Sequence, residues 1–128
     1  MSSFSLECAS QGGSSKMIEG GKSTVVQIPN FIESVEISEN GVARVYPKEI
    51  PQTSADARFL YKAETTPEKI FLTNQWNDPD AKVATESIVI DRATGRFSGS
   101  VHSEWIDGNI RDASYFGVCN ASSSERKF

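Results

Sequence analysis

Hydrophobic and polar residues alternate with a period of two along most of this chain, which is the pattern of β-strands with one buried face. In residues 4–8, Phe4, Leu6 and Cys8 fall on one side, and the residues between them are polar. The same alternation, together with short β-branched runs, predicts further strands over 24–28, 35–37, 42–46, 58–64, 69–74, 83–90, 96–101, 101–106 and 109–119. Their number and spacing are typical of an all-β sandwich or barrel.

Short polar segments that contain glycine separate the predicted strands. Asn40-Gly41 and Asp107-Gly108 are compact turn pairs, and both residues of the first pair tolerate the positive φ angles of a type I′ turn. In residues 91–95, Asp91 is expected to accept hydrogen bonds from backbone N–H groups two or three residues ahead. Gly95 is expected to take the left-handed conformation that closes a bulged loop.

Residues 20–24, Gly-Gly-Lys-Ser-Thr, end like a phosphate-binding P-loop. That motif needs an earlier glycine where Lys16 stands, and it needs a strand before it and a helix after it. We therefore reject a nucleotide site here and predict a flexible loop in which the glycines permit close turns.

We predict one antiparallel all-β domain over residues 1–128, either a β-sandwich or a small up-and-down barrel with little helix. The best helical alternative is the segment 54–64, whose alanines and aromatic residues also fit one helix face. The polar tail 121–128 is expected to be flexible. No fixed-period repeat and no low-complexity linker interrupts the chain.

The net charge of −4 is spread evenly, because residues 1–64 hold six Lys/Arg against eight Asp/Glu and residues 65–128 hold seven against nine. No basic surface is available to neutralise several phosphates, so nucleic acid is not expected as a partner. No apolar run approaches the length of a membrane span. The first residues show no export signal as given, which fits either a cytoplasmic protein or a mature exported chain.

Cys8 and Cys119 are the only cysteines, and each lies in a predicted strand near one end of the chain. An even count without CxxC spacing favours a disulfide over a metal site or a redox pair. First and last strands of a sandwich or barrel are often neighbours, so the bridge is geometrically reasonable. The alternative is two unrelated buried thiols in a cytoplasmic protein.

The C-terminal third carries an IDRxTGxF-like hairpin over 90–97 and a Gly117-Val118-Cys119 run before a basic-aromatic end. With Cys8, these elements resemble small exported bacterial β-domain proteins of uncharacterised function. The resemblance implies export and a periplasmic or secreted location, but no activity. The layout is also similar to that of small periplasmic lysozyme inhibitors, whose Ser-Gly segment leads to Tyr. Here Ser98-Gly99 is followed by other residues.

Candidate contact residues are few. Trp76 lies in a polar loop and Trp105 precedes the Asp107-Gly108 turn, so either can anchor a ligand or a partner or cap the core. Arg92 and Arg96 stand at the tip of the 91–95 loop and are further contact candidates. Turn chemistry already accounts for that loop, which makes a structural corner its simpler interpretation.

No catalytic residue, metal site or cofactor is predicted. His102 is the sole histidine, with Ser100 on the same face of its strand, but no nucleophile elbow surrounds either residue. Carboxylate pairs close in sequence are available for acid–base work or for a cation: Glu36/Glu39, Asp78/Asp80 and Asp107/Asp112. The segment 77–80 lacks the glycine and the distant glutamate of a calcium loop.

The favoured function is a non-catalytic, exported binding or inhibitory module built on a disulfide-tied β domain, with a protein or small-molecule ligand of unknown identity. The first alternative is a cytoplasmic phage or bacterial accessory protein with reduced cysteines. The second is a small carboxylate-dependent enzyme with its site in a barrel mouth. A deep pocket that gathers carboxylates would favour the enzyme, and an exposed apolar patch around a tryptophan would favour a protein partner.

Overall fold

The structure is a computed structural model, and it describes residues 4–47, 60–75 and 80–121. The regular structure of these ranges is β-strand throughout, and none of their residues is helical. In chain order the strands are β1 (Phe4–Glu19), β2 (Lys22–Gln27), β3 (Ile32–Ile37), β4 (Val42–Pro47), β5 (Leu60–Thr65), β6 (Lys69–Gln75), β7 (Ala81–Asp91), β8 (Arg96–Trp105) and β9 (Ile110–Ala121).

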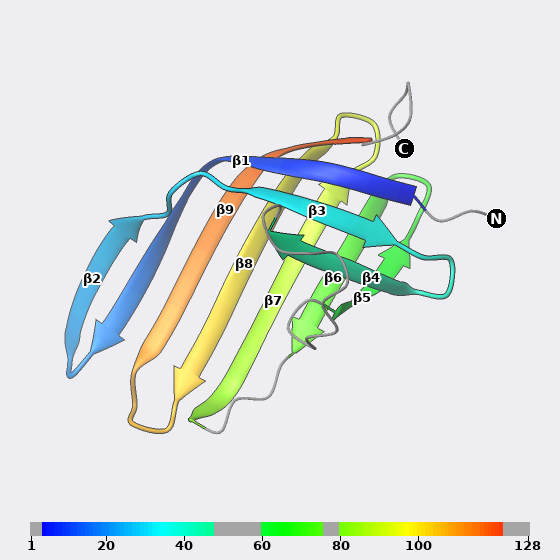
Figure 1. Cartoon of the computed structure of the whole chain (residues 1–128). Helices are drawn as coiled ribbons and strands as arrows, with labels where there is room; N and C mark the ends of the chain where they lie inside the picture. Colours follow the sequence, from blue (N-terminus) through cyan, green and yellow to red (C-terminus); the bar gives the residue numbers. More distant parts are fainter. Residues whose placement is uncertain (1–3, 48–59, 76–79, 122–128) are drawn as a thin grey trace.

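Eight of these strands form a closed antiparallel barrel (Figure 1). Hydrogen-bonded neighbours run in the order β1-β3-β4-β5-β6-β7-β8-β9, and β9 pairs back with β1 to close the sheet. The all-β prediction is confirmed, and the barrel form is the correct one. Because the circuit closes, each of its eight strands has a hydrogen-bonded neighbour on both sides.

The first strand, β1, is sixteen residues long and has two different neighbours on one side. Its first part pairs with β3, from Phe4 opposite Ile37 to Ala9 opposite Ile32, and its second part pairs with β2. Along its other side it follows β9 throughout, with a register shift between Ser10 and Gly12. The second part of β1 therefore stays paired with β9, while β2, on its other side, lies outside the barrel circuit (Figure 1).

The loop predicted over residues 20–24 is shorter than expected, and the strand predicted over 24–28 begins two residues earlier. Gly20 and Gly21, with φ angles of 56° and 83°, form a tight turn, and β2 begins at Lys22. Pairing with β9 carries β1 through residues that were assigned to no strand, and β2 adds to its opposite edge. The start of β2 was missed because the strand is wholly exposed, so no burial signal in the sequence marks where it begins.

The hairpin loops follow their turn chemistry. In the 91–95 loop, Asp91 Oδ1 accepts hydrogen bonds from the N–H groups of Ala93 (2.9 Å) and Thr94 (3.0 Å), and Gly95 is left-handed with φ 79°. That prediction is confirmed. At Asn40-Gly41 only the glycine has a positive φ, and Gly41 N–H donates to Ser38 O, so the type I′ prediction is wrong. This geometry is a type I turn followed by a glycine bulge.

Antiparallel order places the start of β1, the turns after β3, β5 and β7, and the end of β9 at one end of the barrel, here called the packed end. Alternate residues of each strand point inward there and fill the interior. The largest side chains with less than 2% exposure are Leu6, Ile70, Leu72, Ile90 and Cys119. Burying each large aliphatic chain contributes roughly 1.5–3 kcal/mol, so this half supplies most of the hydrophobic stabilisation.

The disulfide between Cys8 and Cys119 joins β1 to β9 within this core. The two residues are opposite partners in the β1–β9 register, with a Cα–Cα distance of 3.9 Å. The predicted bridge is thus confirmed. The segment 54–64 is a strand where it is described, from Leu60 onward.

Candidate ligand-binding cavity

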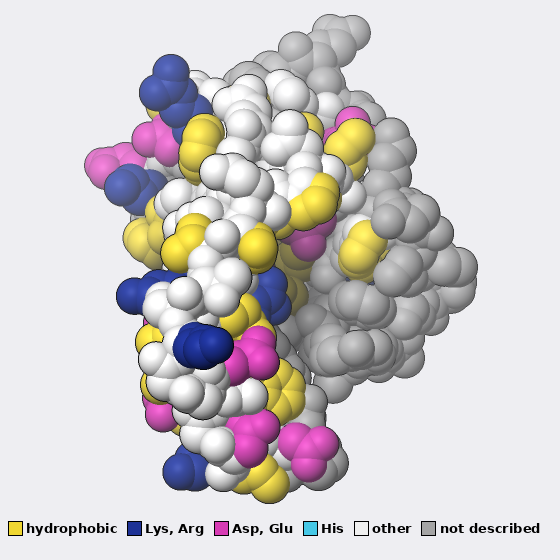
Figure 2. All heavy atoms as spheres, turned by 90° about the vertical axis from the view of Figure 1, so that its left-hand side faces the viewer, with side chains coloured by type: hydrophobic (Ala, Val, Ile, Leu, Met, Phe, Trp, Pro, Cys, Tyr) yellow, Lys and Arg dark blue, Asp and Glu magenta, His cyan; other side chains and the backbone are white. Residues whose placement is uncertain are grey.

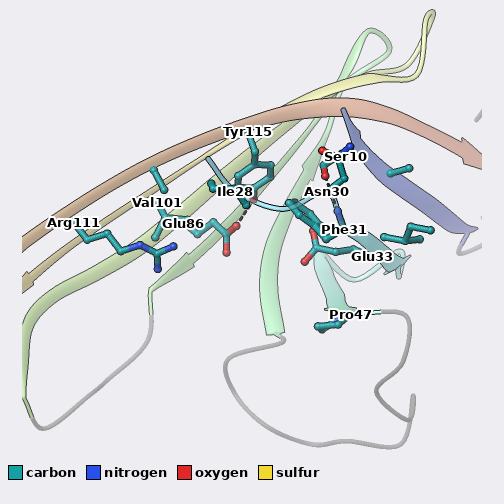
Figure 3. Close-up of a pocket in the computed structure, with 13 residues that line it drawn as sticks. Ser10, Ile28, Asn30, Phe31, Glu33, Pro47, Glu86, Val101, Arg111 and Tyr115 are labelled. Atoms are coloured by element: carbon teal, nitrogen blue, oxygen red, sulfur yellow. Dashed lines mark hydrogen bonds between the residues drawn. The ribbon is translucent and has the colours of Figure 1, made fainter. Parts of the chain in front are cut away.

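The end of the barrel opposite the packed end, here called the open end, contains a cavity of about 890 Å³ (Figure 3). Its lining is mostly apolar, with a few polar groups that converge on it: Ala9, Ser10, Ile28, Asn30, Phe31, Ile32, Glu33, Pro47, Glu86, Val101, Arg111, Ala113 and Tyr115. Seen from the side of β2, hydrophobic, basic and acidic side chains lie together on this part of the molecule (Figure 2). A cavity of this size and mixture is typical of small-molecule sites.

Glu86 is held at the inner wall of the cavity by two tyrosines. Tyr61 on β5 and Tyr115 on β9 each donate a hydroxyl hydrogen bond to its carboxylate, one to each oxygen. Burial, followed by the negative charge of Glu86, raises the pKa of both tyrosines, so both hydroxyls stay protonated and donate. The carboxylate is therefore fixed in orientation, and each of its oxygens accepts one hydrogen bond.

A glycine makes this arrangement possible. Gly99 on β8 lies directly opposite Tyr115, and a Cβ atom at Gly99 would fall 2.2 Å from the tyrosine ring. The ring therefore lies over the glycine backbone, and its hydroxyl reaches past β8 to Glu86 on β7. Phe31 holds the same ring from the other side, edge to face at a centroid distance of 5.2 Å.

Glu33 is the second carboxyl group of the cavity. It is the inward residue of β3 that lies opposite Cys8 on β1 and Pro47 on β4. Burial, followed by the charge of Glu86, raises its pKa from the ordinary value of 4.5 to about 7. Among the described residues, none forms a hydrogen bond or an ion pair with this carboxyl group. It is therefore a desolvated acid that changes charge near neutral pH.

Arg111 is the cation of the cavity. On β9 it is the next inward position after Ala113, toward the β8–β9 turn, so it lies nearer the open end than Glu86, which is aligned with Val101 and Ala113. Its Nε donates to Ser15 Oγ at 3.0 Å, which fixes the guanidinium plane. In the part of the chain that the structure describes, its Nη atoms make no hydrogen bond. They extend into the cavity (Figure 3).

The segment between β2 and β3 forms one wall. Phe31 N–H donates to Ser10 Oγ at 2.8 Å, and Ser10 N–H donates to Phe31 O at 2.9 Å. Ile28 N–H donates to Gly13 O at 3.0 Å. These bonds tie the segment to β1 where its register shifts, and they turn Ile28 and Phe31 toward the cavity (Figure 3).

Trp105 is partly buried and lines an adjoining hollow of about 640 Å³ together with Met17, Val26 and Arg111. It lies beside the open end, and its contact role stays a prediction. Trp76, the other candidate, lies outside the described residues.

The two arginine candidates, Arg92 and Arg96, lie at the packed end of the barrel, whereas the cavity lies at the open end. Arg92 Nη1 donates to Thr66 O at 2.7 Å, and the backbone N–H of Arg92 donates to Glu68 O at 2.9 Å. Through these two bonds Arg92 joins two neighbouring hairpin loops. Arg96 is exposed at the start of β8, on its outward face. The structure does not bring these arginines together with Trp105.

His102 lies on the outer face of the barrel and does not contact the cavity. Its ring nitrogens lie 2.5 Å from Asp112 Oδ1 and 2.9 Å from Glu104 Oε2. The hydrogen bond with Asp112, and next the one with Glu104, raise its pKa above 6.5. This is a surface ion pair across β8 and β9. No group of three or more potential metal ligands occurs within the described ranges, and those ranges contain no helix that could cross a membrane.

Sequence reasoning missed Glu33, Glu86, Tyr115 and Arg111, which form the polar part of the cavity. The carboxylate pairs that it considered were close in sequence, whereas Glu33 and Glu86 meet only because β3 and β7 face each other across the barrel. A signal was present, because Glu33 occupies the same alternating positions as Val35 and Ile37. Glu86 likewise shares the parity of Ile88 and Ile90.

The fold and the cavity define a small disulfide-closed β-barrel whose interior is packed at one end and hollow at the other. Comparison with protein-family models, with curated proteins and with solved structures finds no match to this chain.

Proposed function

We propose that this protein is an exported, non-catalytic binding module that takes one small organic ligand into the open end of its barrel. The observation that carries the proposal is the cavity of about 890 Å³, with apolar walls and a few oriented polar groups. Small-molecule sites commonly have volumes of about 300–1,000 Å³ and occur in the mouths of β-barrels.

A small molecule fits this site better than a protein partner does. The polar groups of the cavity point inward, where a folded surface cannot reach them. Among the described residues, the exposed large apolar side chains are distributed over several strands, and Trp105 is partly buried.

The disulfide supports export, since such bridges persist in oxidising compartments and are rare in the cytosol. The likeness of the C-terminal third to small exported bacterial β-domain proteins agrees with a periplasmic or secreted location. Counting free thiols in the denatured protein without reductant tests this part. Two reactive thiols in protein isolated from its native source would contradict export.

The cavity is tested with N-phenyl-1-naphthylamine, a neutral fluorescent probe whose emission rises in apolar sites. We expect saturable binding to the wild-type protein and its loss in Val101→Trp, which fills the cavity with an indole ring. Ser100→Trp is the matched control, because Ser100 is the exposed neighbour on the outer face of the same strand. Both variants are checked for wild-type thermal unfolding. Equal probe binding by both tryptophan variants would contradict the proposal.

One observation favours a second function, a small enzyme that uses Glu33 as a general acid or base. A carboxyl group whose pKa is about 7 is suited to proton transfer at neutral pH. This alternative is tested with chromogenic 4-nitrophenyl esters, phosphates and glycosides. Turnover that disappears in Glu33→Gln and persists in the surface variant Glu64→Gln would establish the enzyme.

A further inference from the structure

We propose that the ligand is a zwitterion with an apolar body, whose ammonium group lies between Glu33 and Glu86 and whose anionic group pairs with Arg111 nearer the open end. This inference rests on the proposed function and names the chemical class of the ligand. Three features of the cavity carry it: an acidic inner region, a cation one inward position further out, and apolar walls beside them.

The inner region favours a cation. Glu33 and Glu86 face the same space from β3 and β7 (Figure 3). The Glu86 carboxylate already accepts one hydrogen bond from each tyrosine, and its remaining lone pairs are available. Within the described ranges the Glu33 carboxyl has no partner, so an ammonium group would supply the missing donor and the missing positive charge.

The outer region favours an anion. The Nε of Arg111 is occupied by Ser15, which leaves the two Nη groups as a fork directed into the cavity (Figure 3). A guanidinium in this state matches the two oxygens of a carboxylate. A purely cationic ligand would leave the positive charge of Arg111 unpaired inside a partly apolar site. A purely anionic ligand would leave the negative charges of Glu33 and Glu86 unpaired.

Apolar side chains line the cavity beside the two charged regions. Val101 and Ala113 are directly opposed on β8 and β9, and Ile28 and Phe31 face them from the β2–β3 segment. A methylene chain or a ring of a ligand would contact these groups, and hydrophobic burial there would add to the affinity.

The ionisation of Glu33 supports the inference further. The ionisable groups that face it are Glu86 on β7, Tyr61 on β5, and Tyr115 and Arg111 on β9. Because the pKa of Glu33 is about 7, its carboxyl group ionises and the cavity gains negative charge as the pH rises through neutrality. Because a bound ammonium group stabilises the ionised carboxylate, the affinity for an amine rises in the same interval.

Titration calorimetry with octylamine, octanoate and 8-aminooctanoate tests the class of ligand. We expect 8-aminooctanoate to bind more tightly than either singly charged probe. Glu33→Gln should weaken octylamine and 8-aminooctanoate by roughly ten- to a hundredfold, the range of one charge-assisted hydrogen bond, and leave octanoate unaffected or slightly tighter. Arg111→Gln should weaken octanoate and 8-aminooctanoate instead. The surface variants Glu64→Gln and Arg96→Gln are the matched controls.

A second measurement needs no variant. The affinity of the wild-type protein for octylamine should rise between pH 5.5 and pH 8, while the amine itself stays protonated. If 8-aminooctanoate binds no better than octylamine, or if Glu33→Gln changes neither amine, the inference is wrong. The proposed function still stands in that case if N-phenyl-1-naphthylamine binds and Val101→Trp blocks it, whereas failure of that probe overturns both.

Discussion

The two ends of this barrel are built from the same strands but differ in what their inward residues are. At the packed end, β6 and β7 contribute Ile70, Leu72 and Ile90, each with no detectable exposure. Toward the open end, the inward residues of these neighbouring strands are charged instead, with Glu86 on β7 and Arg111 on β9. Period-two alternation sets which residues point inward, and their chemistry then decides whether that half is a core or a site.

The comparison shows how such a small barrel can hold charged groups in its interior. Buried carboxyl groups are costly, and desolvation raises the pKa of Glu33 for this reason. The packed end and the disulfide offset it, because they hold the barrel closed independently of the open end.

Removing the disulfide should have the largest effect. The bridge joins residues 111 positions apart, so the double variant Cys8→Ser/Cys119→Ser frees nearly the whole described chain in the unfolded state. The expected loss is about 4–5 kcal/mol in the free energy of unfolding by the chain-entropy estimate. Urea unfolding measures it. A loss below about 1 kcal/mol would show that the bridge does not hold the packed end together.

Large-to-small substitutions should separate the two ends. Leu72→Ala removes a fully buried side chain and should cost about 3 kcal/mol. Val101→Ala, at the cavity, should cost less than about 1 kcal/mol, because Val101 is partly exposed beside existing empty space. Equal losses for both variants, measured by urea unfolding, would mean that the open end is packed as tightly as the core.

Glu33 should make stability depend on pH. Its pKa is raised from 4.5 in the unfolded chain to about 7 in the folded protein, so the folded state holds the proton more tightly. The stabilising contribution of the neutral carboxyl is complete below about pH 4.5 and is lost as the pH rises through about 7. The loss is on the order of 3 kcal/mol over that interval.

The control is Glu33→Gln, which cannot titrate. The difference in unfolding free energy between wild type and variant should therefore change over this pH range and level off above it. The pKa of Asp91 is lowered by its bonds with Thr94 and Ala93, and it contributes equally to both proteins. A difference that stays constant with pH would show that Glu33 is not desolvated in the cavity.

His102 should have the smallest effect. Its ion pairs with Asp112 and Glu104 lie on the outer face, where all three side chains are at least 41% exposed. His102→Ala should change the free energy of unfolding by less than about 1 kcal/mol. Its raised pKa makes this contribution present at acidic pH and lost as the pH rises through the folded value. Proton NMR titration should give a pKa above 6.5 for His102. A lower value would contradict the ion pairs with Asp112 and Glu104.

The sequence predicted those features that depend on local pattern. The Asp91–Gly95 turn and the pairing of Cys8 with Cys119 follow from turn chemistry and from the adjacency of terminal strands. The loop predicted over 20–24 extended too far, because β2 is wholly exposed and no burial signal marks where it begins. The cavity could not be predicted, since bringing Glu33 to Glu86 requires knowing which strands face each other across the barrel.

The most direct test of the central claim, that the open end is a ligand cavity and the packed end is not, is methyl NMR with N-phenyl-1-naphthylamine. The account predicts that the probe shifts the methyl signals of Val101, Ala113 and Ile28 and leaves those of Ile70, Leu72 and Ile90 unchanged. Shifts confined to outward residues such as Val25, or no shift at saturating probe, would contradict it.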